Sequence, residues 1–228
     1  FKPNTKAVFG ETLANPALTV FDIEKWANIA HKNNVPLIVD NTFATPVLCR
    51  PIEWGADIVI HSTTKYMDGH AVQGGGVIVD GGNYDWGNGK FPQIDGPSEG
   101  YHGLNLHKAF GRAAFIVKCR VDGLRDLGCC PSPFDSYLML LGLETLSLRV
   151  RHEVESTRRL AEYCRSHPKV ARVSYVGFDT HPSFENARKY YRFGSSAVFT
   201  IELKGTLEST VRFVEALHLA ANMTMIGD

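Results

Sequence analysis

Polar side chains that could bind a ligand or take part in a reaction lie at three predicted strand ends. Asn15 follows the first strand, Asp40 ends the second and is followed by Thr42, and Ser62-Thr63-Thr64-Lys65 follows the third. In an open α/β sheet, ligands bind outside the carboxyl ends of the strands. A single polar residue there is an ordinary cap or turn former, but three such groups at neighbouring strand ends predict a ligand site.

Lys65 is the strongest candidate for covalent chemistry. It follows hydroxyl residues at the end of a buried strand, where loss of solvation favours a neutral amine that can form an imine. The Asp40 carboxylate is suited to pair with a cationic ring nitrogen of a cofactor. The hydroxyls of Ser62 and Thr64 suit a phosphate ester close to that lysine. The spacing alone leaves open a structural ion pair between Lys65 and Asp40.

An α/β domain is predicted to position these strand ends. Apolar runs at 36–40 and 56–62 are typical of parallel strands buried on both faces, and 74–80 predicts a further strand after an approach strand at 7–9. Apolar residues at i, i+3, i+4 and i+7 from Ile23 predict a helix that Asp22 caps. Strands alternating with helical segments predict a mostly parallel sheet with helices on both faces.

The second half of the chain changes character. Glycine, proline, asparagine and aromatic residues at 83–111 predict a long ordered excursion, after which helical pattern resumes at 113–127. A long helical region is predicted from Ser132 to about Ser166, interrupted at Gly142. Strands at 170–176 and 197–203 and a helix at 207–219 predict a smaller C-terminal α+β domain.

Composition excludes several function classes. Lys and Arg number 24, as do Asp and Glu, so no basic field is available for nucleic acid or an anionic membrane. No apolar run approaches the roughly 20 residues of a membrane span, and the opening residues do not predict a secretory leader. The five cysteines show no C-x-x-C spacing and the histidines show no metal-binding spacing. We therefore expect free thiols in the cytoplasm and no metal site.

Several motifs around these residues resemble a known family. Val39–Thr42 (VDNT) and His61–His70 (HSTTKYMDGH) resemble the two central motifs of the Cys/Met-metabolism enzymes that depend on pyridoxal phosphate (PLP), and Glu11–Pro16 (ETLANP) resembles the motif before them. Gly142–Leu146 with Arg149 is similar to the segment that enters the family's C-terminal domain. The resemblance implies the type I, aspartate-aminotransferase-like PLP-dependent transferase fold. Residues 1–146 would be part of the PLP-binding large domain and residues 147–228 the start of the small domain.

The resemblance also implies a role for each polar residue at the strand ends. Lys65 matches the Schiff-base lysine that also moves protons on the substrate, and Asp40 matches the partner of the pyridine nitrogen. Ser62 and Thr64 match phosphate ligands. Asn15 matches the amide near the phenolic oxygen of the ring, and Thr42 matches a pocket residue.

Within the family, Gly74–Trp86 and Gly89–Pro92 resemble the insertion of the sulfhydrylases that act on O-acetylhomoserine. This implies replacement of the γ-acetate by sulfide or a thiol, giving homocysteine or methionine, in a homo-oligomer (dimer or tetramer). A cystathionine γ-synthase or a methionine or cystathionine γ-lyase is the alternative, because it would share the Lys65 site. A non-catalytic fragment that retains the fold is the alternative of another class.

The chain is expected to be part of a longer polypeptide, shortened at both ends. It begins at Phe1 in a strand approach and stops at Asp228. The family's N-terminal phosphate loop and ring-stacking tyrosine, and its C-terminal arginine for the substrate carboxylate, have no counterpart here. We therefore expect the 228 residues alone to be inactive and to hold PLP weakly.

Overall fold

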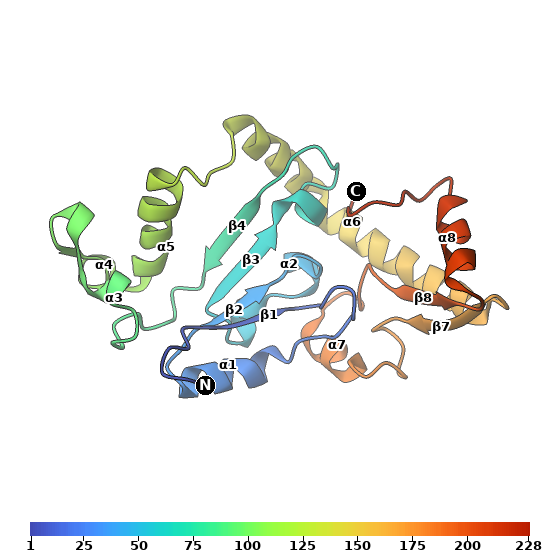
Figure 1. The fold of residues 1–228 in the computed structure, drawn as a ribbon, viewed down its shortest axis with the longest axis horizontal. Coiled ribbons are helices and arrows are strands. Elements are labelled where there is room, and N and C mark those ends of the chain that lie inside the picture. The colour runs from blue at the N-terminus through green and yellow to red at the C-terminus, as the bar shows by residue number, and fades with distance from the viewer.

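A four-stranded sheet lies at the centre of the structure, a computed structural model that describes residues 1–228 (Figure 1). Its strands follow the spatial order β1-β2-β3-β4 and span Val8–Glu11, Leu37–Asp40, Ile58–Ser62 and Gly76–Asp80. β1 pairs with β2, and β2 with β3, in parallel, whereas β4 runs antiparallel to β3. β4 needs no crossover helix, because antiparallel neighbours can be joined by a short connection. The predicted mostly parallel sheet is confirmed, with its antiparallel strand at one edge.

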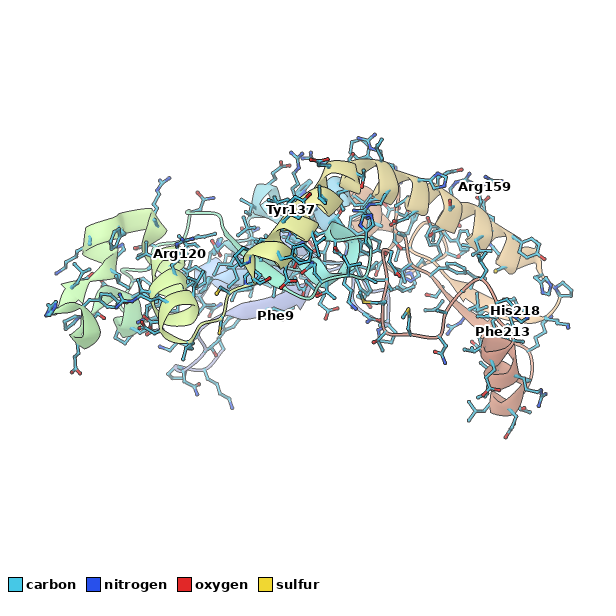
Figure 2. The ribbon with its side chains drawn as sticks, turned by 90° about the horizontal axis from the view of Figure 1, so that it is seen from above. Phe9, Arg120, Tyr137, Arg159, Phe213 and His218 are labelled. Atoms are coloured by element: carbon cyan, nitrogen blue, oxygen red, sulfur yellow. The ribbon has the colours of Figure 1, made fainter.

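The two faces of the sheet pack against different parts of the chain. Leu37, Val39 and Val59 point to one face, where helices α1 (Ile23–Lys32) and α6 (Pro133–Ser166) complete the larger hydrophobic core. Because side chains alternate along a strand, Ile58 points to the other face and belongs to a second, smaller core. Phe9 lies on β1 and stays 58% exposed on the molecule's surface (Figure 2).

The predicted excursion after β4 is ordered and builds the smaller core. Trp86 stacks on Phe115 with ring centroids 4.8 Å apart, and its ring edge meets Phe91. The elements of this region are α3 (Pro92–Asp95), β5 (Pro97–Ser98), β6 (Leu104–Asn105), α4 (Leu106–Phe110), α5 (Ala114–Lys118) and a π-helical segment at Cys119–Asp126. This region lies at the end of the molecule away from the C-terminal strands (Figure 1).

The cap predicted for the first helix is confirmed. The Asp22 side chain accepts a hydrogen bond from the Lys25 backbone N–H, which satisfies one of the free donors at the helix start. The helix ends at Lys32, and the Asn33 backbone N–H donates to the carbonyls of the last turn. Ile23, Ala27 and Ala30 form the buried stripe that places α1 against the sheet.

α6 corrects one prediction, because Gly142 does not interrupt it. The helix runs for 34 residues from a cap at Ser132, with Pro133 in its first turn and Gly142 buried in its middle. Packing rather than a break requires this glycine, because a Cβ on Gly142 would lie 2.5 Å from the Met67 carbonyl oxygen. No helix of the structure combines the length and the apolar character needed to span a membrane.

The C-terminal region is the predicted mixture of strands and helices. β7 (Val170–Ser174) pairs antiparallel with β8 (Thr200–Leu203), and α7 (Phe184–Tyr190) lies between them in the chain. α8 (Leu207–Glu215) ends four residues before the predicted boundary at 219. Residue 146 lies inside α6, so the division into 1–146 and 147–228 stays a prediction. The chain also contains the short helix α2 (Thr45–Leu48) and 3-10 turns at Pro51–Trp54, Glu99–Tyr101 and Gly111–Ala113.

Candidate active site

Lys65 sits in an unusual turn at the carboxyl end of β3. The chain leaves the strand at Ser62 and enters a single π-helical turn at Thr63–Met67, which we call the lysine turn. Within it, the Lys65 backbone has φ −96° and ψ −130°, outside the helical region. Two hydrogen bonds brace the start of the turn, from the Thr63 N–H to the Gly75 carbonyl (2.9 Å) and from Gln73 Nε2 to the Thr63 carbonyl (2.9 Å).

The Lys65 amine points at the C-terminal segment rather than at a carboxylate. Lys65 Nζ donates to the Thr224 carbonyl at 2.6 Å and lies 3.3 Å from Met225 Sδ. No ion pair joins it to Asp40 or to any other acid. The structural ion pair that the sequence left open is therefore absent, and the amine is free of electrostatic pairing.

A hydroxyl bridge connects the ends of β2 and β3. The Asp40 Oδ1 atom accepts hydrogen bonds from the Thr42 N–H (2.9 Å) and from Thr42 Oγ1 (2.6 Å). Thr42 Oγ1 in turn accepts from the Ser62 N–H at 2.8 Å. Both bonds to Asp40 use one oxygen, which leaves Oδ2 available for a cationic N–H. The structure thus brings Asp40, Thr42 and Ser62 together. The sequence did not predict that the Thr42 hydroxyl links the Asp40 carboxylate to the Ser62 backbone.

Thr64 and Asn15 lie at the same edge of the sheet but outside that bridge. Thr64 Oγ1 accepts from the Gly75 N–H at 3.0 Å, which ties the lysine turn to the start of β4. A Cβ on Gly75 would lie 2.9 Å from Thr63 Oγ1, so the Thr63 hydroxyl occupies the space that a side chain at Gly75 would need. Asn15 is exposed, and its backbone N–H donates to Glu11 Oε2 at 3.1 Å. It makes no hydrogen bond with the other predicted site residues.

His61 is a buried neutral group next to the site. It lies on the face of β3 opposite Ser62, is 5% exposed, and its Nδ1 atom has no hydrogen-bond partner. Burial lowers the pKa of His61 to about 4, and the Asp40 charge only partly opposes that shift. The imidazole therefore carries no charge at neutral pH and does not neutralise Asp40.

These residues fit the groups of PLP. The residues at the ends of β2 and β3 provide an amine without an ion pair, a carboxylate with one free oxygen, and two partly exposed hydroxyl side chains. The aldehyde of PLP forms an imine with an amine, its pyridinium N–H pairs with a carboxylate, and its phosphate accepts hydrogen bonds from hydroxyl groups. The chemistry of this donor set is thus the one that the cofactor needs.

The structure adds residues to the site that the sequence did not predict there, although Arg149 was noted as part of a family motif. The Arg149 guanidinium, on α6, donates to the Tyr66 carbonyl at 2.9 Å, one residue after Lys65. Thr224 and Met225 contact the lysine itself. These contacts join positions 83 and about 160 residues apart, so no local pattern could have revealed them.

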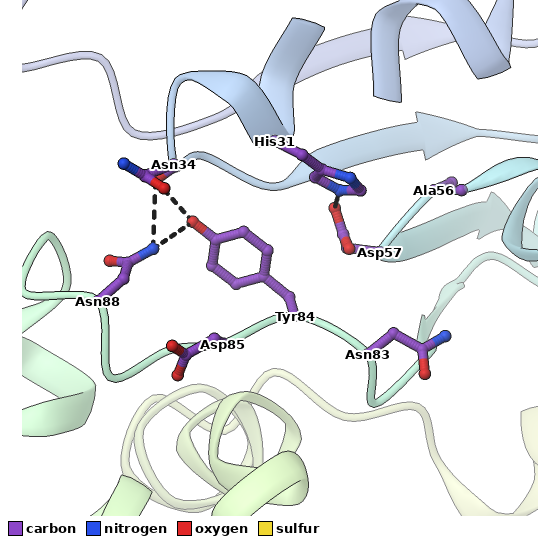
Figure 3. Close-up of a pocket in the computed structure, with 9 residues that line it drawn as sticks. His31, Asn34, Ala56, Asp57, Asn83, Tyr84, Asp85 and Asn88 are labelled. Carbon is purple, nitrogen blue, oxygen red and sulfur yellow. Dashed lines mark hydrogen bonds and ion pairs between the residues drawn. The ribbon is translucent and has the colours of Figure 1, made fainter. Parts of the chain in front are cut away.

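A separate cavity lies at the opposite end of the sheet, before β3 begins (Figure 3). It encloses about 300 Å³ and is lined by polar side chains, among them His31 and Tyr84. The buried Asp57 carboxylate accepts from the Leu37 N–H and contacts His31 Nε2, both at 2.8 Å. Burial raises the pKa of Tyr84 to about 12, and its hydroxyl donates to the Asn34 carbonyl. Asp57 joins α1 to the start of β2, which is a structural task far from Lys65.

Comparison with known proteins identifies the family of this chain. The family described as Cys/Met metabolism PLP-dependent enzyme matches residues 1–228. The chain is 47% identical to O-acetyl-L-homoserine sulfhydrylase 1 of Thermus thermophilus over 98% of its length and 53% of that protein. It is 45% identical to homocysteine synthase of Schizosaccharomyces pombe, over 99% of its length and 53% of that protein.

A solved structure from Campylobacter jejuni supports the fold. That protein, assigned as an O-acetylhomoserine (thiol)-lyase and carrying N′-pyridoxyl-lysine-5′-monophosphate, superposes with a TM-score of 0.95 at 31% identity, covering 100% of this chain and 57% of its own. The chain spans about half the length of the curated relatives it matches. It belongs to the Cys/Met metabolism family of PLP-dependent enzymes, with the type I fold that its motifs predict.

Proposed function

We propose that the protein containing this chain replaces the γ-acetate of O-acetylhomoserine with sulfide or a thiol, giving homocysteine or methionine plus acetate. The observation that carries the proposal is that Lys65, which makes no ion pair, follows β3 at the same end of the sheet as Asp40 and Ser62, in a chain 41–47% identical to O-acetylhomoserine sulfhydrylases and homocysteine synthases. In this reaction the Cγ–O bond breaks, acetate leaves with the bonding pair, and sulfur forms the new bond to Cγ. One sulfhydryl proton is released for each acetate displaced.

Lys65 is the proposed catalytic residue. Its amine would hold the cofactor covalently between turnovers, and then carry protons between the substrate's Cα, Cβ and Cγ. PLP, when bound, supplies an electron sink for the pair left at Cα. The lysine turn holds the amine at the sheet edge, where it has no competing acid to pair with.

Asp40 and the hydroxyls are the proposed cofactor-binding residues. The free Asp40 oxygen would accept the pyridinium N–H, with Thr42 holding the carboxylate in place through its two hydrogen bonds. Ser62 and Thr64 would donate to the phosphate, and Asn15 to the phenolic oxygen. The neutral state of His61 supports this assignment, because a charged imidazole would compete for Asp40.

The proposal also covers the location, assembly and domain division of the enzyme. We infer a cytoplasmic enzyme that works as a homo-oligomer, with residues 1–146 in the PLP-binding domain and residues 147–228 beginning the small domain. Further cofactor contacts would come from the rest of the polypeptide and from a neighbouring subunit. Sulfide or a thiol and O-acetylhomoserine are the small-molecule partners.

A product assay with the full-length protein tests the activity. With PLP present, O-acetylhomoserine plus sulfide, cystathionine, and methionine are supplied in separate reactions. The proposal expects homocysteine and acetate from the first reaction to form faster than any product of the other two. Dominant release of α-ketobutyrate would favour a γ-lyase instead, and no turnover of any substrate would favour a non-catalytic protein.

A further inference from the structure

One arginine joins the lysine turn to two other segments. Arg149 Nη2 donates to the carbonyls of Tyr66 (2.9 Å) and Gly142 (2.8 Å), and Nη1 approaches the Gly227 carbonyl at 3.5 Å. Its Nε atom donates to Thr145 Oγ1 at 3.0 Å, which fixes the plane of the guanidinium. Arg149 is the only α6 side chain that hydrogen-bonds the lysine turn.

The lysine turn is shaped to accept this arginine. Gly69, just after the turn, has φ +66°, and a Cβ there would overlap the Arg149 guanidinium. At Gly142 the α6 backbone lies directly against the carbonyls of Met67 and Asp68. Glycine on each side of the contact thus lets backbone meet backbone, and the guanidinium fills the space that remains.

The same guanidinium reaches the segment that contacts the Lys65 amine. Lys65 Nζ donates to the Thr224 carbonyl at 2.6 Å, and three residues later the Gly227 carbonyl meets Arg149. A Cβ on Gly227 would lie 2.7 Å from the Tyr66 ring, so this segment is packed closely on the turn. Arg149 and Lys65 therefore hold the segment 224–227 at two points, and Arg149 also holds the turn that carries Lys65.

We propose that Arg149 is a positioning residue, which fixes the Lys65 amine relative to the segment 224–227 and so sets the position from which Lys65 transfers protons. The inference rests on the proposed role of Lys65. A planar guanidinium with five N–H donors can serve carbonyls in several directions at once. A lysine in its place is a single donor centre on a flexible stem, so it would hold one or two of these carbonyls but not the whole set.

The test compares Arg149→Gln and Arg149→Lys with Arg159→Gln in the full-length protein. Arg159 lies on the same helix, exposed at the surface, and makes no ion pair (Figure 2). The first readout is the kcat and KM of the proposed reaction. A lysine displaced by about 1 Å costs up to about 100-fold in rate, so we expect Arg149→Gln to lower kcat by about 10- to 100-fold. KM should change by less than about threefold, because substrate binding is not the function removed.

The second readout does not depend on activity. After the cofactor is removed with hydroxylamine, Lys65 is labelled with an acylating reagent and its peptide is quantified by mass spectrometry, with the exposed Lys108 as internal reference. Losing hydrogen bonds that restrain Lys65 should speed its labelling about fivefold in Arg149→Gln, and less in Arg149→Lys. Arg159→Gln should match the parent in both readouts. If Lys65 proves not to be the cofactor lysine, the labelling result still tests the positioning claim.

A milder variant serves as a control in case Arg149→Gln misfolds. Thr145→Val removes only the hydroxyl that orients Arg149, and Thr145 is exposed on α6. It should shift the labelling rate in the same direction by a smaller factor. Unchanged Lys65 labelling in both Arg149→Gln and Thr145→Val would overturn the inference, as would equal speeding of Lys65 and Lys108 or a rise in KM at unchanged kcat.

Discussion

Replacing Gly142 with alanine should destabilise the protein, although alanine is the better helix former. Gly142 lies in the middle of α6, buried against the chain that follows Lys65. A Cβ at this position would lie 2.5 Å from the Met67 carbonyl oxygen and closer still to that of Asp68. Both obstacles are backbone atoms, so no side chain can rotate away to make room.

The size of the effect follows from two opposing contributions. Overpacking a well-packed interior costs about 1–3 kcal/mol, and the upper end applies here because the backbone itself must move. Replacing glycine by alanine in a helix returns about 1 kcal/mol. We therefore expect Gly142→Ala to lower the free energy of unfolding by about 2 kcal/mol.

Urea denaturation of the full-length protein measures this difference. The matched control is Gly123→Ala, because Gly123 lies in the helical segment Cys119–Asp126 and a Cβ there meets nothing within 4 Å. That variant should be neutral or stabilised by up to about 1 kcal/mol. Unfolding of Gly142→Ala at the same or a higher urea concentration than the parent would refute the packing argument.

Three further predictions concern the site. Lys65→Ala should abolish turnover while circular dichroism shows the parent fold, and more than trace activity without added amine would contradict its role. Asp40→Asn should keep the cofactor nearby but cost several orders of magnitude in kcat, since an amide cannot hold the pyridinium proton; near-normal kinetics would make Asp40 structural. His61, with a pKa of about 4 when folded against 6.5 unfolded, should cost stability as pH falls. Because the unfolded chain binds the proton more readily, protonation lowers the free energy of unfolding as the pH falls below 6.5. Above pH 6.5 this loss is absent, and towards pH 4 it reaches about 3 kcal/mol. In His61→Gln, urea titrations at several pH values should show a flatter pH dependence, and an unchanged slope would disprove it.

The site's strand ends were predictable because their pattern is local. Apolar runs that end in Asp40 and Ser62 mark buried parallel strands, and parallel neighbours bring their carboxyl ends to one edge. The helix that begins after Asp22 was equally clear from its cap and its apolar stripe. The order of these elements predicted the mostly parallel α/β sheet, whereas the type I fold and the PLP chemistry were implied only by the family resemblance of the motifs.

Other features depend on contacts between distant segments. Gly142 reads as a helix interruption in sequence, because nothing nearby reveals that Asp68 lies against it. Arg149 was noted only as part of a family motif, and its contact with the lysine turn became evident from its three carbonyl partners in the structure. The part played by Thr42 depends on the register of β2 against β3, which sequence periodicity does not specify.

Borohydride trapping of the full-length protein tests the central claim most directly. The protein is saturated with PLP, reduced and digested, and the peptide that carries the pyridoxyl group is identified by mass spectrometry. We expect one stoichiometric adduct, on Lys65, and none on Lys65→Ala. An adduct on another lysine, or no adduct on the folded parent protein, would contradict it.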